Sequence, residues 1–104
     1  MSMPAAKSKD GYDVTRVAWR GIGLEVRHCR TWSIAAGIDH IEVVSDERAP
    51  LPITETGYRS HFIMPEEIAE IGTPLEYVIA WLDYEAQSKS WIAQEAAARQ
   101  LNLF

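Results

Sequence analysis

The spacing of hydrophobic residues changes once along this chain, near Met64, and that change sets the class of fold. Before Met64, apolar side chains recur at every second position, which is typical of strands that bury one face. After Met64 they recur every three or four positions, as they do in amphipathic helices. A single switch of this kind predicts an α+β protein, with a three- or four-stranded, mostly antiparallel sheet followed by two or three C-terminal helices packed on one face.

The strand pattern appears in four segments. Residues 14–20 and 22–27 alternate on either side of Gly21, and a glycine takes the positive φ of a tight turn at little cost. These two segments therefore predict a β-hairpin. Residues 38–45 and 58–64 predict a third and a fourth strand, and the segment between them is irregular because it contains two prolines and a glycine.

The helical pattern begins directly after the last predicted strand. Pro65 suits the first turn of a short helix, and Gly72 can end it. Thr73 and Glu76 have the spacing of a capping box, which predicts the start of a longer helix. The alanine-rich run that follows either continues this helix or restarts after a break, and its composition favours helix up to about Arg99.

Length and composition predict one domain. A chain of 104 residues with 47% hydrophobic content can build a single core. We expect a flexible leader over residues 1–11, the domain over 12–99 and an interaction tail over 100–104. The apolar runs are too short for a membrane span or a secretory signal, and the one cysteine, Cys29, cannot form an internal disulfide. These features predict a cytoplasmic protein.

The net charge of −5 is unevenly distributed. Residues 1–30 carry six basic and three acidic side chains, a balance of +3, whereas residues 31–104 have a balance of −8. Most of the surface should therefore repel nucleic acid, and no direct nucleic-acid binding is expected. The basic strip on the predicted hairpin is better explained by solvated arginines on an outward face than by phosphate contacts.

The residues that could support catalysis or metal binding are few. His28, Cys29, His40 and His61 include no pair with a metal-ligand spacing, so neither a metal nor another cofactor is predicted. Neighbouring His28 and Cys29 should point to opposite faces of a strand. A nucleophilic site made of Cys29 with His40 or His61 is an alternative, but a small buried thiol and partly exposed histidines explain the same residues. The sequence therefore favours a non-enzymatic domain.

One loop region could form a polar pocket. It is rich in hydroxyl groups and contains Glu55, Arg59 and His61, which makes it the candidate site if the domain binds a ligand or is an enzyme. The four tryptophans and four tyrosines are better explained by core packing than by a ligand site. Nothing in this region identifies a substrate.

The last five residues, "QLNLF", form a motif of their own. They resemble the pentapeptide by which bacterial DNA polymerases, mismatch-repair proteins and replication regulators bind the ring-shaped DNA sliding clamp, whose preferred form is Q-L-[S/D]-L-F. Gln100, Leu101, Leu103 and Phe104 match this form, and Asn102 is a small polar replacement for Ser or Asp. A match at one fixed position has a chance probability on the order of 10⁻⁵ or less from average residue usage.

The resemblance implies a binding mode in which an extended peptide places Leu103 and Phe104 in an apolar cleft of the clamp. Leu101 would contact the wall of the cleft, and the amide of Gln100 would fill a polar subsite. The alternative is that Leu101, Leu103 and Phe104 close the domain's own core after the last helix. Both readings follow from the same apolar residues.

The whole chain also resembles small proteins of proteobacterial chromosomes and plasmids that have no assigned activity. The resemblance rests on the stretches "WRGI…EV", "PLPITETGYRSHF" and "AWLD". It implies a bacterial source but does not imply any activity or mechanism.

Overall fold

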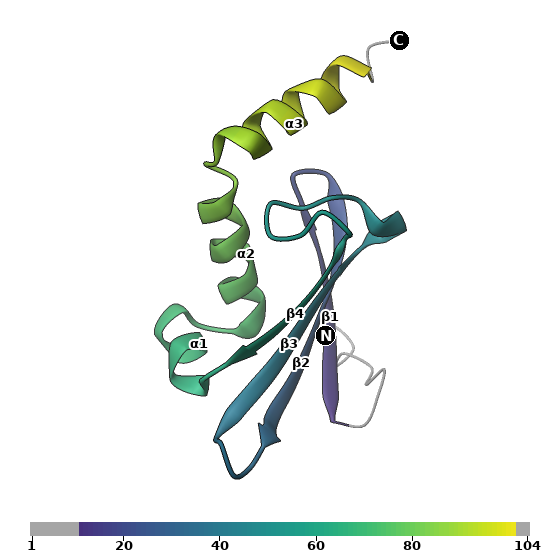
Figure 1. The fold of residues 1–104 in the computed structure, drawn as a ribbon. Helices are drawn as coiled ribbons and strands as arrows, with labels where there is room; N and C mark the ends of the chain where they lie inside the picture. The colour runs from purple at the N-terminus through teal and green to yellow at the C-terminus, as the bar shows by residue number, and fades with distance from the viewer. Residues whose placement is uncertain (1–10, 102–104) are drawn as a thin grey trace.

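The chain folds into a four-stranded sheet followed by three α-helices, as the computed structural model shows for residues 11–101 (Figure 1). The α+β prediction is therefore confirmed. The strands are β1 (Tyr12–Trp19), β2 (Ile22–Ser33), β3 (Ile38–Ser45) and β4 (Tyr58–Ile63). The helices are α1 (Pro65–Ile71), α2 (Pro74–Glu85) and α3 (Lys89–Leu101), and a short 3₁₀ turn, η1 (Asp46–Arg48), follows β3.

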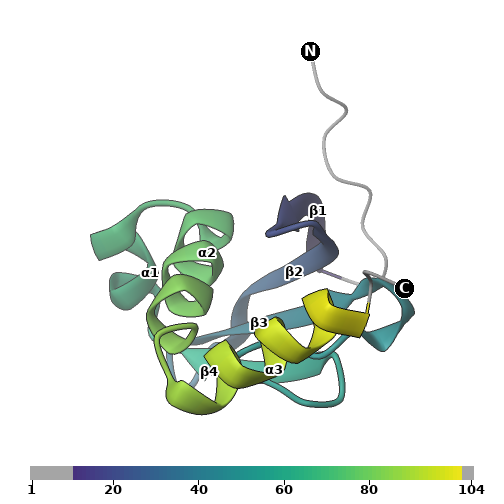
Figure 2. The same cartoon turned by 90° about the horizontal axis from the view of Figure 1, so that it is seen from above.

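The sheet is an antiparallel meander in which strands adjacent in the sequence are also adjacent in space, in the order β1-β2-β3-β4. Arg20 and Gly21 form the β1–β2 turn with φ values of 49° and 82°, and two positive φ values are typical of a type I′ hairpin turn. Figures 1 and 2 show that α1 and α2 lie along one side of the sheet. The sheet thus has a face that the helices cover and a face that they leave open.

The covered face and α2 form the core. The strand register brings the apolar positions of β2 and β3 together on this face, where they meet the apolar stripe of α2. Burying each of these side chains contributes about 1.5–3 kcal/mol before the cost of ordering the chain. The side chains that are fully buried are Leu24, Val26, Ile41, Val43, Val78 and Leu82.

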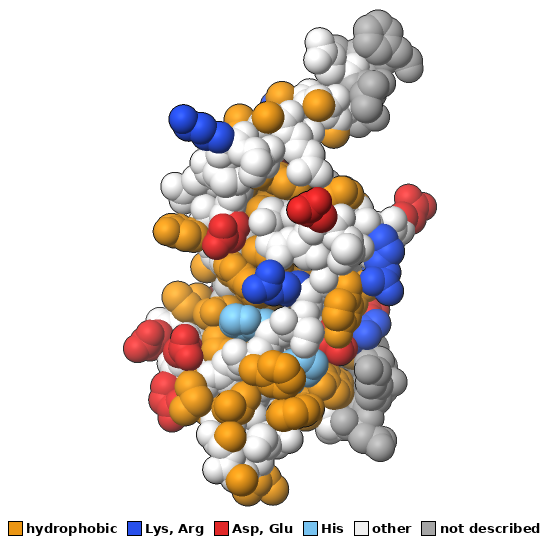
Figure 3. Space-filling model, in the orientation of Figure 1, with side chains coloured by type: hydrophobic (Ala, Val, Ile, Leu, Met, Phe, Trp, Pro, Cys, Tyr) orange, Lys and Arg blue, Asp and Glu red, His pale blue; other side chains and the backbone are white. Residues whose placement is uncertain are grey.

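The open face carries the side chains that alternate along each strand with those of the covered face. Tyr12, Cys29, His40 and Phe62 lie in register across the four strands. Phe62 remains 50% exposed, and its ring contacts that of Trp32, which is 53% exposed. Hydrophobic side chains also gather over the lower part of the sheet in the space-filling view (Figure 3). The strand alternation predicted from the sequence is thus confirmed on both faces.

The helix signals of the sequence are confirmed at α1 and α2. Thr73 Oγ1 accepts a hydrogen bond from the Glu76 backbone N–H at 3.1 Å, and Glu76 Oε1 accepts one from the Thr73 N–H at 2.9 Å. These two bonds form the expected capping box. The helical run breaks after Ala86, and α3 extends to Leu101, two residues beyond the predicted end at Arg99.

The described part of the chain contains no helix that is long and apolar enough to span a membrane. Apart from Gly11, the predicted leader lies outside the described residues.

Candidate functional site

The helix α3 buries much less of its surface than the sheet and α2 do. Trp91 is buried, whereas the side chains from Ile92 to Gln100 are exposed except for the half-buried Glu95. The helix leaves the layer formed by α1 and α2 and runs across the end of the sheet (Figures 1 and 2). The stability of α3 along its whole length therefore depends mainly on the helix propensity of its alanine, glutamine and arginine residues.

Two contacts connect α3 to the sheet. The rings of Trp91 and Trp19 lie 5.9 Å apart, and both side chains are buried. One turn further along, the Glu95 carboxylate accepts from Arg20 Nη1 at 3.3 Å, so the ion pair links α3 to the β1–β2 turn. Arg99 lies 3.9 Å from the same carboxylate. Among the described residues, α3 is thus attached through Trp91, which belongs to the core cluster, and through a partly exposed ion pair.

The predicted partner-binding residues continue from the end of α3. Gln100 and Leu101 are in the last turn of the helix, and the Gln100 side chain is exposed. The Leu101 side chain and the residues Leu103 and Phe104 lie outside the described part of the structure. The helix thus includes the first two positions of the motif.

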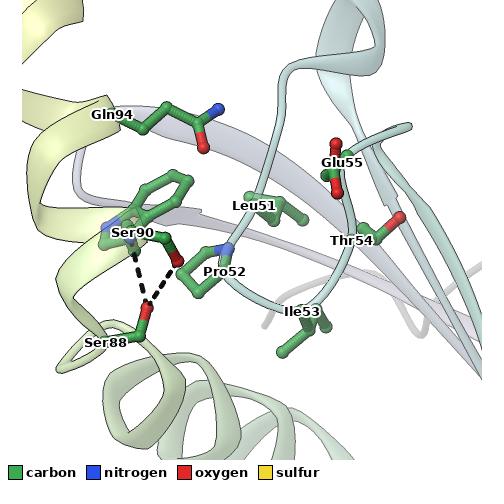
Figure 4. A pocket seen from close by; sticks show the side chains of 9 residues that line it. Leu51, Pro52, Ile53, Thr54, Glu55, Ser88, Ser90 and Gln94 are labelled. Carbon is green, nitrogen blue, oxygen red and sulfur yellow. Dashed lines mark hydrogen bonds between the residues drawn. The ribbon is translucent and has the colours of Figure 1, made fainter.

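Two adjoining cavities lie along the side of α3 that faces the sheet. One, of about 410 Å³, separates loop residues 51–55 from the start of α3. Figure 4 shows this loop on one side and Ser88, Ser90 and Gln94 on the other. The second, of about 560 Å³, lies between the later turns of α3 and residues 20–22 and 49–50. Trp91 and Gln94 line both cavities, and we call the combined feature the α3 groove.

Trp91 also has an unusual polar atom. Its indole Nε1 is buried and has no hydrogen-bond partner among the described residues. Most buried N–H groups in folded proteins are paired, because an unpaired one costs about 1–3 kcal/mol. The donor is therefore a feature of the α3 groove that the packing of the domain does not explain.

The structure brings two of the three predicted pocket residues together. Arg59 and His61 lie on the covered face of β4 and both contact Trp81 of α2, with the guanidinium 5.2 Å and the imidazole 4.5 Å from its ring. Burial, and secondly the charge of Arg59, lower the pKa of His61. Glu55 is exposed and lines the 410 Å³ cavity instead.

This arrangement has limited chemical capacity. A neutral imidazole can accept a proton, and a guanidinium can bind an anion. Arg59 Nη1, however, donates to the Ile53 carbonyl at 3.0 Å and so helps to hold the loop. The contacts of Arg59 and His61 are thus explained by packing of the loop and of α2 on β4.

The histidines and the cysteine are divided between the two faces, as the alternation predicts. His28 lies on the covered face, where its Nε2 is 2.8 Å from Asp39 Oδ2. Cys29 is the cross-strand partner of His40 on the open face. The two ring nitrogens of His40 lie near hydroxyl groups, Nδ1 at 2.5 Å from Tyr12 Oη and Nε2 at 2.6 Å from Ser60 Oγ.

The hydroxyl partners of His40 did not emerge from the sequence. Tyr12, His40 and Ser60 share the open face only once the register between strands is known, and spacing within one strand does not reveal that register. Burial, and secondly Glu42, raise the pKa of Tyr12, so its phenol is protonated at neutral pH. Within residues 11–101, no group of three or more His, Cys, Asp or Glu side chains is placed to hold a metal ion.

Comparison with known proteins supports one assignment. No curated protein and no solved structure matches the chain. A family model described as the KlcB third domain matches residues 12–91, which include the whole sheet, α1, α2 and the start of α3. Because this match spans more than half of the sequence, the chain belongs to the KlcB third-domain family.

Proposed function

We propose that this domain binds a protein partner through residues 100–104 and that the partner is the bacterial replicative sliding clamp. The proposal rests on the resemblance of this segment to the clamp-binding pentapeptide. The observation that supports it in the structure is the exposure of α3 up to and including Gln100. Another protein can therefore reach the first position of the motif, Gln100, while the sheet stays folded.

The energetics of such a peptide agree with a reversible complex. Burial of Leu103 and Phe104 in an apolar cleft would contribute roughly 4–6 kcal/mol, and Leu101 would add a smaller amount. Loss of translational freedom and ordering of the peptide offset part of this gain. A dissociation constant of roughly 1–100 μM is therefore expected for the isolated interaction.

The proposal concerns a segment outside the family match. The matched residues end at Trp91, so the motif is a feature of this chain beyond the matched span. The sheet and α2 would then be the part that is carried to the clamp, and α3 would be the spacer between them. No enzymatic step is part of the proposal.

The direct test is calorimetric titration of the full chain with purified clamp. We expect micromolar binding by the wild type and at least a tenfold loss in the double variant Leu103→Ala/Phe104→Ala. Ile92→Ala is the matched control, because it removes an exposed apolar side chain from α3 outside the motif. Asn102→Asp introduces a residue that the motif prefers at this position, so it should strengthen binding.

Thermal melting of the same double variant separates this proposal from the reading in which the tail closes the core. If Leu103 and Phe104 were core residues, their removal would cost several kcal/mol and would lower the melting temperature by many degrees. The clamp proposal expects a small change. A large drop in melting temperature together with no clamp binding by the wild type would refute it.

A further inference from the structure

We propose that a cavity beside the end of β2 binds a small oxyanion, that is, a carboxylate or a phosphate group. The cavity has a volume of about 290 Å³ and lies between the end of β2, the start of β3 and residues 65–74. Its polar lining residues are His28, Arg30, Thr31 and Asp39. All of them lie within the residues that match the family model, so this site is separate from the C-terminal motif.

The imidazole of His28 has one nitrogen that the protein holds and one that faces solvent. Nε2 lies 2.8 Å from Asp39 Oδ2, and both residues are buried. The other nitrogen, Nδ1, has no hydrogen-bond partner among the described residues. It is not among the buried polar atoms that lack a partner, so solvent reaches it. His28 lines the cavity, which therefore provides the space for a ligand at Nδ1.

The guanidinium of Arg30 is a second group without a partner. The other described arginines each form an ion pair or stack on an aromatic ring. The Arg30 side chain forms neither an ion pair nor a hydrogen bond with any described residue, and it lines the same cavity as His28. A guanidinium presents its N–H donors in one plane and can bind a carboxylate or a phosphate through two parallel hydrogen bonds.

The acidic residue in the lining is already engaged within the protein. Asp39 Oδ2 is paired with His28, and Oδ1 accepts from the Thr31 backbone N–H at 2.8 Å. Thr31 has a φ of 52°, which β-branched residues rarely adopt. Strained backbone of this kind is concentrated at functional sites. Asp39 thus holds the imidazole so that Nδ1 is the nitrogen left for a ligand.

The groups that remain for a ligand are mainly hydrogen-bond donors. Arg30 provides N–H groups and Thr31 a hydroxyl, and protonation of His28 converts Nδ1 from an acceptor to a donor. A ligand with several acceptor oxygens and a negative charge can pair with all three. Binding of such an anion should therefore be accompanied by uptake of a proton at His28.

Other charged groups near the cavity limit the affinity for an anion. Asp13 of β1 is the exposed cross-strand partner of His28. A carboxylate oxygen of Glu76 lies close to Gly72, which lines the cavity, although it also accepts from the Thr73 N–H. The lining residues from α1 are uncharged. We expect weak, reversible binding with a dissociation constant of roughly 1–10 mM.

The test is an NMR titration of the full chain with sodium sulfate at constant ionic strength. The ring resonances of His28, which His28→Gln assigns, should shift and reach saturation. Arg30→Gln, at an exposed position, should weaken binding by about tenfold or more, because it removes a charged donor. Arg99→Gln is the matched control. It removes the same charge from the exposed surface of α3, outside the cavity, and should change the affinity by less than about twofold.

Two further measurements complete the test. Sulfate keeps its charge between about pH 5 and 8, the range in which imidazoles commonly titrate, so its affinity should rise about tenfold on acidification. His28→Gln should abolish this rise, and a pH-independent affinity of the wild type would overturn the role of His28. A parallel titration with acetate shows whether the site prefers a planar or a tetrahedral oxyanion.

The proposal would be overturned by shifts that grow without saturation with both anions, or by an Arg30→Gln affinity equal to that of the wild type. None of these measurements involves the clamp. Their outcome is therefore independent of the proposed function.

Discussion

The sheet with α2, residues 12–85, and the helix α3 differ in what holds them in place. The former contains six fully buried side chains in two layers, contributed by β2, β3 and α2. Among the described side chains of α3, one is buried, that of Trp91, and one, that of Glu95, forms an ion pair with the β1–β2 turn. The difference shows that the chain combines a packed scaffold with a helix that depends largely on its own propensity.

Such a division has a physical consequence for function. A 13-residue helix is marginally stable in water when it stands alone, so α3 should open locally at a lower free energy than the sheet does. Segments that bind partners are commonly drawn from this less stable part of a protein. The family match, residues 12–91, covers the sheet with α2 and only the first three residues of α3.

The largest expected effect on the free energy of unfolding comes from the loss of packing between α2 and the sheet. Leu82→Ala removes a side chain with no exposed surface and should lower the free energy of unfolding by about 2–5 kcal/mol. Ile92→Ala on α3, where the side chain is 54% exposed, should change it by less than about 0.5 kcal/mol. Urea denaturation measures both. Equal effects of the two variants would show that α3 is part of the same core.

A smaller effect is expected at the attachment of α3. Glu95→Gln removes the charge that pairs with Arg20 and Arg99, and partly exposed ion pairs contribute about 0.2–1 kcal/mol. Hydrogen exchange should become faster in residues 92–101 and remain unchanged in β2 and β3. Glu70→Gln, on the exposed surface of α1, is the control. Faster exchange throughout the sheet would contradict the separation of the two regions.

The smallest expected effect is on the pH dependence of stability, because His61 is only partly buried. Its pKa in the folded protein is below the ordinary value of 6.5, so the unfolded chain binds more protons as the solution is acidified. The contribution of His61 is therefore fully present above pH 6.5 and is lost as the pH falls below that value. His61→Gln should flatten this part of the stability curve, as measured by urea denaturation from pH 5 to 8. An unchanged slope would show that Arg59 and burial do not affect the titration.

The sequence predicted those features that depend on local geometry. Alternation identified the four strands, Gly21 the hairpin turn, and Thr73 with Glu76 the start of α2, because each signal involves residues within a few positions of one another. It did not predict that β2 continues to Ser33. Residues 28–33 are largely polar, and their pairing with β3 shifts register between Cys29 and Ser33.

The candidate site could be predicted only in part for the same reason. The pentapeptide is a contiguous motif, so it is readable from five residues. The α3 groove brings residues 20–22, 49–55 and 88–99 together, and no spacing within the sequence indicates that these three segments meet. Proximity in the chain groups Glu55 with Arg59 and His61, whereas in the structure Glu55 lines the 410 Å³ cavity and the other two residues contact Trp81.

The meander order of the strands bears on how the domain acquires its structure. Each strand pairs with the one that precedes it, so the first two pairings close short loops, residues 20–21 and 34–37, and only the pairing of β4 closes a longer one, residues 46–57. A topology of this kind has a low contact order compared with sheets whose strands cross over, and low contact order is associated with fast folding. Each hairpin can form on the microsecond timescale and provide the edge for the next strand. Docking of α2 and α3 then joins distant parts of the chain, since Trp19 Nε1 donates to Asp83 across 64 positions of sequence and Arg20 Nη1 donates to Glu95 across 75.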